Sequence, residues 1–306
     1  MTWRLRLDVF AMLDGLCATL PVALFASFTQ SAAYVGCLYV CVSHQTKGGR
    51  RAPDRNDPDV IRERFFRVGV ACVLGPVIAV AAAAAPGAPS ACTPGVSLLR
   101  WFGLVAVDLR TLLLGSVLPL LLTMVLFIGP LVMTYLDRDR GESTLAQLMA
   151  YAAELNDLKS MRNLVVGPIT EEWVFRSCMC PLLHTAGLSP AAAVFASGGI
   201  FGLAHVHHVF DAGTPWIGIA VQFTYTSLFG AYSSYLFLRT GLIYGPVLAH
   251  AFCNCMGLPD FGRAFKEQAI GGAFVLGLGS FVILTVLDAI YRPSLFASVM
   301  WNESSA

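Results

Sequence analysis

The chain has 306 residues, of which 56% are hydrophobic and 13% charged, and its formal net charge is +1. A soluble domain of ordinary composition carries about 25% charged residues, so this composition predicts a protein whose solvent is the bilayer. The near-neutral charge argues against a nucleic-acid partner. We therefore expect one all-α, polytopic integral membrane domain over residues 1–306.

Apolar segments that approach the roughly 20 residues needed to span a bilayer occur along the whole chain. They predict seven to eight transmembrane helices that enclose an intramembrane cavity. Residues 1–160 would supply N-terminal helices and basic loops, 161–260 the core that carries the polar motifs, and 261–306 a C-terminal helix and tail. The segments cover residues 16–42, 68–85, 112–135, 191–204, 217–238, 242–256 and 269–290, and a weaker one, 164–183, contains two glutamates and an arginine.

Two stretches between these segments are rich in basic residues, and two predicted spans separate them. Because an even number of spans returns the chain to the same side, both stretches can lie on one side of the membrane. The positive-inside rule makes that side cytoplasmic. The first stretch, 44–67, holds Lys47, Arg50, Arg51, Arg55, Arg62, Arg64 and Arg67, and the second, 136–163, holds Arg138, Arg140, Lys159 and Arg162.

The nine cysteines include no CxxC pair. This argues against a disulfide framework and against a zinc ribbon. We expect most of the cysteines to be small buried apolar residues.

Charged side chains inside membrane segments are costly and persist mainly where they face a bundle interior or a water-filled cavity. The stretch 170–176, Thr-Glu-Glu-Trp-Val-Phe-Arg, contains three of them. Residues four apart share a helical face, so Glu172 and Arg176 can pair and play a structural role. Glu171 projects about 100° away and has no local partner. Desolvation would make it a suitable general base.

Two histidine clusters follow along the chain. His205 ends an apolar run and lies deepest in it, whereas His207 and His208 come next and suit a wet interface patch. His250 and Asn254 are four residues apart and project from one helical face. Both can donate hydrogen bonds, so the pair could stabilise an oxyanion in a dry cavity or join two membrane helices.

Together these residues could supply a base, an orienting group and an oxyanion hole. Since there is no obvious serine with a paired base, the simplest chemistry is attack of an activated water on a carbonyl, that is, hydrolysis. Three alternatives remain at this point. Cys178 could act as a thiolate nucleophile, Glu171, His205 and His250 could bind zinc, and the buried polar residues could form the proton relay of a transporter. The spacing does not name a substrate.

The three clusters resemble the EExxxR, FxxxH and HxxxN motifs of the CPBP family of intramembrane proteases. The stretches 170–181, 201–208, 222–241 and 245–259 are similar to the eukaryotic CAAX prenyl protease 2 family, that is, the type II CAAX prenyl endopeptidases, and the likeness is densest over 160–260. A member that binds lipidated partners without cleaving them is the non-enzymatic alternative.

The resemblance implies an endopeptidase that removes the C-terminal aaX tripeptide from isoprenylated CAAX proteins of the small GTPase type at the endoplasmic reticulum membrane. By the same resemblance, Glu171 would be the catalytic base and His205 its partner at the water. His250 and Asn254 would form the oxyanion hole, and Glu172 and Arg176 would shape the site. No metal or other cofactor is expected.

Overall fold

The computed structural model describes residues 17–39, 54–85, 97–137, 157–210, 215–291, 295–296 and 298–302. None of these residues forms a strand, which confirms the predicted all-α fold for the described part of the chain. The α-helices are α2 (Leu20–Tyr39), α3 (Pro58–Ala83), α4 (Leu98–Trp101), α5 (Leu109–Leu126), α6 (Ile128–Asp137), α8 (Leu158–Met161), α9 (Gly167–Glu172), α10 (Met179–Thr185), α11 (Pro190–His205), α12 (Trp216–Thr240), α13 (Tyr244–Met256), α14 (Phe261–Lys266), α15 (Gln268–Tyr291) and α16 (Val299–Asn302). Two π-helices, η1 (Arg162–Val166) and η2 (Trp173–Cys178), and one 3₁₀-helix, η3 (Val206–Phe210), complete the set.

Four of the described helices are long and apolar enough to cross a membrane: α2, α3, α5 and most of α15. A shorter apolar helix, α11, accompanies them. The protein is therefore a polytopic membrane protein, whereas the number of seven to eight spans stays a prediction.

The structure differs from the sequence prediction over 112–135, where two helices replace one. The helix α5 ends at Leu126, and Phe127 caps it with a backbone N–H that bonds to the carbonyl of Thr123. Pro130 has no N–H with which to bond the carbonyl four residues earlier. The chain therefore restarts as a separate helix, α6.

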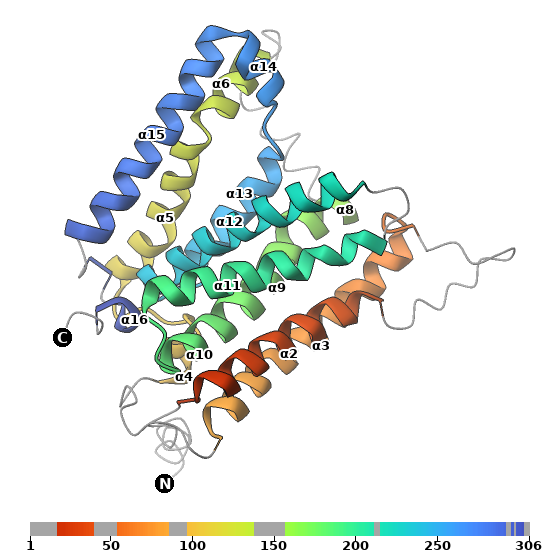
Figure 1. Ribbon diagram of the computed structural model, residues 1–306, viewed down its shortest axis with the longest axis vertical. Coiled ribbons are helices and arrows are strands. Elements are labelled where there is room, and N and C mark those ends of the chain that lie inside the picture. The colour runs from red at the N-terminus through yellow and green to blue at the C-terminus, as the bar shows by residue number, and fades with distance from the viewer. Residues whose placement is uncertain are drawn as a thin grey trace, which may run out of the picture.

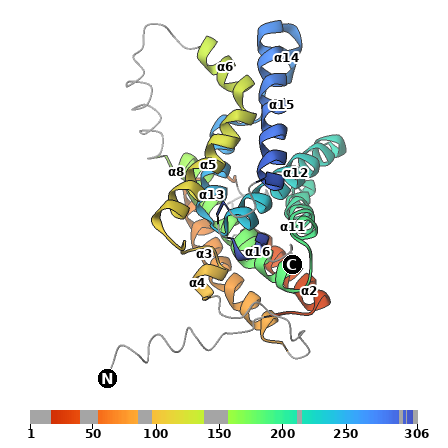
Figure 2. The ribbon, with the colours of Figure 1, turned by 90° about the vertical axis from the view of Figure 1, so that its left-hand side faces the viewer.

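The helices form two groups that meet at the motif core (Figure 1). Helices α2 and α3 pack against each other along their length, and α11 packs against α12 beside them. Helices α5, α6 and α15 form the second group and extend away from the first, which Figure 2 shows from the side. The segment from η1 to α10 contacts α2, α3, α11 and α13, and α13 in turn packs against α5 of the second group.

Helix α2 runs antiparallel to α3. The backbone N–H of Cys17, before the start of α2, donates to the carbonyl of Ala83, the last residue of α3, at 3.1 Å. At its other end, α3 is initiated by Asp57, whose side chain accepts from the N–H groups of Asp59 and Val60, and by Pro58 in the first turn. This is a favourable N-terminus, and it lies beside the C-terminal end of α2.

Small residues allow α11 and α12 to approach closely. A Cβ atom on Gly198 would lie 2.6 Å from the backbone nitrogen of Ala231, and one on Gly202 would overlap the side chain of Ser227. Such small-residue contacts are typical of helix pairs in membranes. The packing fixes His205, at the end of α11, relative to the helices that carry the other motif residues.

The predicted burial of the cysteines is confirmed only in part, because Cys37, Cys72 and Cys253 are half-buried and Cys255 is exposed. Cys178 and Cys180 are buried and have free thiols, as expected of small apolar residues. Cys17, in contrast, is disulfide-bonded. It lies before α2, at the end of α3, rather than within an apolar helix.

Candidate active site

The two motif glutamates lie at the end of α9, between two π-helical turns. A π-helix bonds residue i to residue i+5 and is frequent at functional sites. Here the irregular turns precede and follow a short α-helical segment, so the two neighbouring glutamates face different surroundings. The side chain of Glu171 is 24% exposed, and that of Glu172 is completely buried.

Glu172 is the centre of a buried polar network. Its Oε2 lies 3.0 Å from Nε of Arg176 and accepts a hydrogen bond from the hydroxyl of Ser233, and its Oε1 accepts from Nδ1 of His250 at 2.7 Å. The Arg176 guanidinium lies 4.4 Å from the centre of the Phe201 ring, a cation–π contact. The predicted pairing of Glu172 with Arg176 is therefore present. Since the network joins α9, η2, α12 and α13, it holds the site together.

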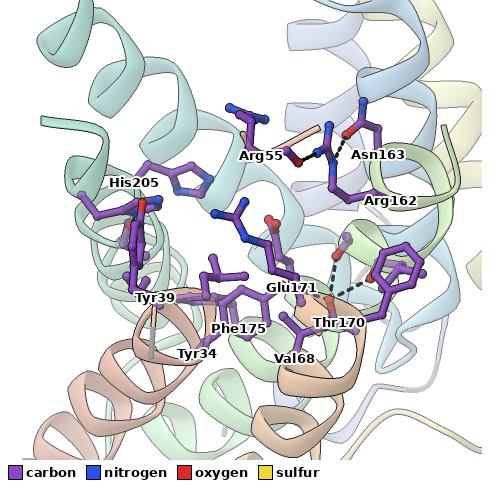
Figure 3. A pocket seen from close by; sticks show the side chains of 18 of the residues that line it. Tyr34, Tyr39, Arg55, Val68, Arg162, Asn163, Thr170, Glu171, Phe175 and His205 are labelled. Atoms are coloured by element: carbon purple, nitrogen blue, oxygen red, sulfur yellow. Dashed lines mark hydrogen bonds between the residues drawn. The ribbon is translucent and has the colours of Figure 1, made fainter. Parts of the chain in front are cut away.

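A cavity of about 500 Å³ opens beside this network, and Glu171 and His205 both line it (Figure 3). The two side chains come from different elements, α9 and the end of α11, and face the same space. Four lining residues of α2 and α3, Val35, Leu38, Phe65 and Val68, are apolar, whereas Arg64 of α3 and the lining residues of η1 and α13 are mostly polar. Its lining residues are Tyr34, Val35, Leu38, Tyr39, Arg55, Arg64, Phe65, Val68, Arg162, Asn163, Val166, Gly167, Thr170, Glu171, Phe175, Ala204, His205, His207 and Asn254.

The His205 ring is held in one orientation. Its Nδ1 lies 2.8 Å from the carbonyl oxygen of Phe201. A carbonyl can only accept, so Nδ1 carries the proton and, in the neutral ring, Nε2 does not. His205 can therefore accept a hydrogen bond from a water molecule in the cavity.

His250 lies between the two glutamates. Its Nδ1 donates to Glu172, and its Nε2 is 4.0 Å from Oε2 of Glu171. In the neutral ring Nε2 is an acceptor, and in the protonated ring it becomes a second donor. His250 can thus act as the oxyanion donor that the sequence suggested only in its protonated form.

Asn254 lines the cavity, but one of its donors has a partner already. Its Nδ2 donates to the backbone carbonyl of Asn163 at 2.8 Å, which joins α13 to η1. A carboxamide carries two N–H donors, so the second can serve an oxyanion. The oxyanion hole formed by His250 and Asn254 therefore stays a prediction. One N–H of Asn254 already bonds to the carbonyl of Asn163.

Cys178, the nucleophile of the thiol alternative, lies apart from the cavity. Cys178 is fully buried and does not line the cavity; a Cβ on Gly75 of α3 would touch its sulfur at 3.3 Å. His207 lines the cavity and packs edge-on against Tyr39, with ring centroids 5.3 Å apart. The side chain of His208 lies outside the described residues. Among the described residues, no three His, Cys, Asp or Glu side chains are grouped as a metal site requires.

Sequence reasoning did not select several residues of this cavity. Tyr34 donates from its hydroxyl to Oγ1 of Thr170 at 2.9 Å, since that oxygen already donates to the carbonyl of Val166. Arg55, Arg64 and Arg162 also reach the cavity, although the sequence indicated only that their loops are basic. The available signal was the position of these arginines next to predicted helix ends.

The fold and the cavity define a class of protein: a polytopic membrane protein with ionisable side chains around an internal cavity. Comparisons with known proteins narrow this class. Residues 157–256 match the family model described as type II CAAX prenyl endopeptidase Rce1-like. The chain is 36% identical to CAAX prenyl protease 2 of Homo sapiens over 301 residues, which cover 93% of this chain and 85% of that protein.

Two further similar proteins carry the same name. CAAX prenyl protease 2 of Rattus norvegicus is 34% identical, over 93% of this chain and 84% of that protein. The Arabidopsis thaliana protein of the same name is 34% identical, over 62% of this chain and 66% of that protein. No solved structure matches the chain significantly. The chain belongs to the Rce1-like family of type II CAAX prenyl endopeptidases, and it is a protease, an enzyme that hydrolyses peptide bonds.

Proposed function

We propose that this protease cleaves isoprenylated CAAX proteins after the prenylated cysteine and releases the C-terminal tripeptide, with Glu171 as the base that activates water. The observation that carries this assignment is the separation of the two glutamates. Glu172 is buried among Arg176, His250 and Ser233, whereas Glu171 reaches the cavity together with His205. This difference supports Glu171, rather than Glu172, as the glutamate that meets water and substrate.

The chemistry follows from these positions. Glu171 removes a proton from a water molecule that Nε2 of His205 orients, and the water oxygen attacks the carbonyl carbon of the prenylated cysteine. The carbonyl oxygen becomes an oxyanion, stabilised by the second N–H of Asn254 and by Nε2–H of protonated His250. The C–N bond then breaks, and the proton held by Glu171 passes to the leaving amine.

The cavity wall suits a substrate that is part lipid and part peptide. Val35, Leu38, Phe65 and Val68 of α2 and α3 supply apolar surface for an isoprenoid chain, whose burial is favourable at about 25 cal/mol per Å². The polar side carries Glu171 and His205. Substrates of the small GTPase type, which present a flexible prenylated C-terminus, fit such a cavity.

We place the cavity at the cytoplasmic side of the endoplasmic reticulum membrane. Arg55 and Arg162, from the two basic stretches, both line it, and the positive-inside rule puts such stretches in the cytoplasm. The disulfide-bonded Cys17 supports the same orientation. It lies at the far end of the 26-residue helix α3, about 39 Å away at 1.5 Å per residue, and disulfides persist in oxidising compartments such as the lumen.

The test is hydrolysis by the purified protein in neutral detergent. A farnesylated CAAX peptide and its non-prenylated counterpart are incubated with the enzyme, and the released tripeptide is identified by mass spectrometry. We expect the tripeptide from the farnesylated peptide alone. Cleavage at another bond, or no cleavage, would contradict the proposed function.

A further inference from the structure

Three arginines converge on the rim of the cavity from separate parts of the chain. Arg55 precedes α3, Arg64 lies within α3, and Arg162 begins η1. Figure 3 shows Arg55 and Arg162 on one side of the cavity, with His205 across from them and Glu171 between. The proposed hydrolysis uses none of the three, so this grouping of positive charge needs its own explanation.

The other two arginines act electrostatically on Arg162. Burial and the like charges of Arg55 and Arg64 lower the pKa of Arg162, and Asp157 and Asp54 oppose this shift. Within the described residues, no carboxylate lies within ion-pair distance of Arg55 or Arg162. Three guanidinium groups that repel each other at a partly buried rim favour an anionic ligand.

Arg162 has a positioning role in this group. Its guanidinium donates to the backbone carbonyl of Arg55 at 2.8 Å, to Oδ1 of Asn56 at 3.3 Å and to Oδ1 of Asn163 at 3.0 Å. These bonds hold the segment before α3 against η1. The Arg55 side chain, by contrast, is exposed and makes no hydrogen bond or ion pair with the described residues. Arg55 is thus the group most open to a ligand, and Arg64 also lines the cavity.

We propose that Arg55 and Arg64 bind the free α-carboxylate at the C-terminus of the substrate. This inference rests on the proposed function and adds to it the feature by which the enzyme recognises a chain end. Every CAAX substrate ends three residues beyond the scissile bond, and three extended residues reach about 10–11 Å. Glu171, His205, Arg55 and Arg64 line one cavity, so the tripeptide beyond the scissile bond would lie within it.

The chemistry of the two ends sets the direction of the peptide. The isoprenoid needs the apolar surface of Val35, Leu38, Phe65 and Val68, whereas a carboxylate against these side chains would lose its hydration without compensation. At the rim, guanidinium groups can form charge-assisted, bidentate hydrogen bonds with it. The carboxylate site thus explains how an internal Cys-aliphatic-aliphatic sequence is distinguished from a true C-terminus.

The test compares one farnesylated CAAX peptide made with a free carboxylate and with a C-terminal amide. Equilibrium affinity for both is measured on Glu171→Gln protein in neutral detergent, where the peptide stays intact. We expect the acid to bind about 10- to 100-fold more tightly than the amide, the scale of one hydrogen bond to a charged group. Adding Arg55→Gln or Arg64→Gln should reduce this affinity ratio towards one, because the affinity for the acid peptide falls while the affinity for the amide peptide stays unchanged.

Arg62→Gln is the matched control. Arg62 lies on the same helix as Arg64 but is exposed, pairs with Asp59 at 2.9 Å and does not line the cavity. It should keep the ratio of the parent protein. Equal affinity of the Glu171→Gln protein for the acid and amide peptides would overturn the carboxylate site. This comparison uses no arginine variant, so it does not depend on whether those variants fold.

An equal loss of acid and amide binding in Arg64→Gln would also overturn the proposal, because it would indicate a general electrostatic effect or a site for lipid phosphate. Hydrolysis of the acid peptide by the unsubstituted enzyme is measured in parallel. Failure of that hydrolysis contradicts the proposed function, whereas the affinity ratio alone decides the carboxylate site.

Discussion

Glu172→Gln should damage the stability of the protein before it damages the chemistry. The carboxylate is completely buried, lies 3.0 Å from Nε of Arg176 and accepts from His250 at 2.7 Å. The glutamine keeps the size but removes the charge, so the buried guanidinium of Arg176 loses its counter-ion. Removing one partner of a buried ion pair typically costs about 3–5 kcal/mol in the free energy of unfolding. Denaturation in detergent micelles, monitored by intrinsic tryptophan fluorescence, measures it.

The chain offers a matched control and a rescue for this prediction. Glu267 pairs with Arg263 at 2.7 Å with the same four-residue spacing, but on the surface, so Glu267→Gln should leave unfolding nearly unchanged. Replacing both buried partners, Glu172→Gln with Arg176→Met, should recover part of the loss because no uncompensated charge remains. If Glu172→Gln unfolds like wild type yet is inactive, the roles of the two glutamates have been assigned the wrong way round.

Three further predictions concern other parts of the site. Asn254→Ala should lower turnover by about 10²–10³ while peptide affinity stays near normal, and unchanged turnover would remove Asn254 from the oxyanion hole. Cys178→Ala should keep most of the wild-type activity, and inactivation of the folded variant would restore the thiol mechanism. Wild-type enzyme treated with a chelator should also stay active, and loss of activity that stoichiometric zinc restores would support a metal mechanism. Cysteines introduced at Lys47 and Arg140, outside the described residues, should be labelled from the cytoplasm, and lumenal labelling of both would refute the orientation.

Several polar residues around the cavity could be selected from the sequence because polar side chains are conspicuous in membrane segments. Glu172 and Arg176, four residues apart, pair as the helical repeat required. Glu171 and His205 stand out from apolar surroundings, and the structure brings both to one cavity. The all-α fold followed from composition for the same reason, since only helices and closed barrels satisfy their backbone within lipid.

The remaining features depend on contacts that sequence spacing does not encode. Asn254 donates to the carbonyl of a residue 91 positions away, and the buried partners of Glu172 include Ser233, which no motif marks. The convergence of Arg55 and Arg162 arises from hydrogen bonds between segments 107 residues apart. Hydropathy predicts a single apolar segment over 112–135, whereas the structure ends α5 at Leu126 and begins α6 at Ile128.

The most direct measurement of the central claim is a single-turnover comparison of wild type and Glu171→Gln on the same farnesylated CAAX peptide, with peptide affinity and unfolding measured on both proteins. The glutamine keeps the size of the side chain and its hydrogen-bonding capacity but cannot accept the proton of water. We predict normal folding, near-normal affinity and a rate of tripeptide release lowered by about 10²–10⁴, the contribution of a general base. Release at close to the wild-type rate would contradict the assignment of Glu171 as the base.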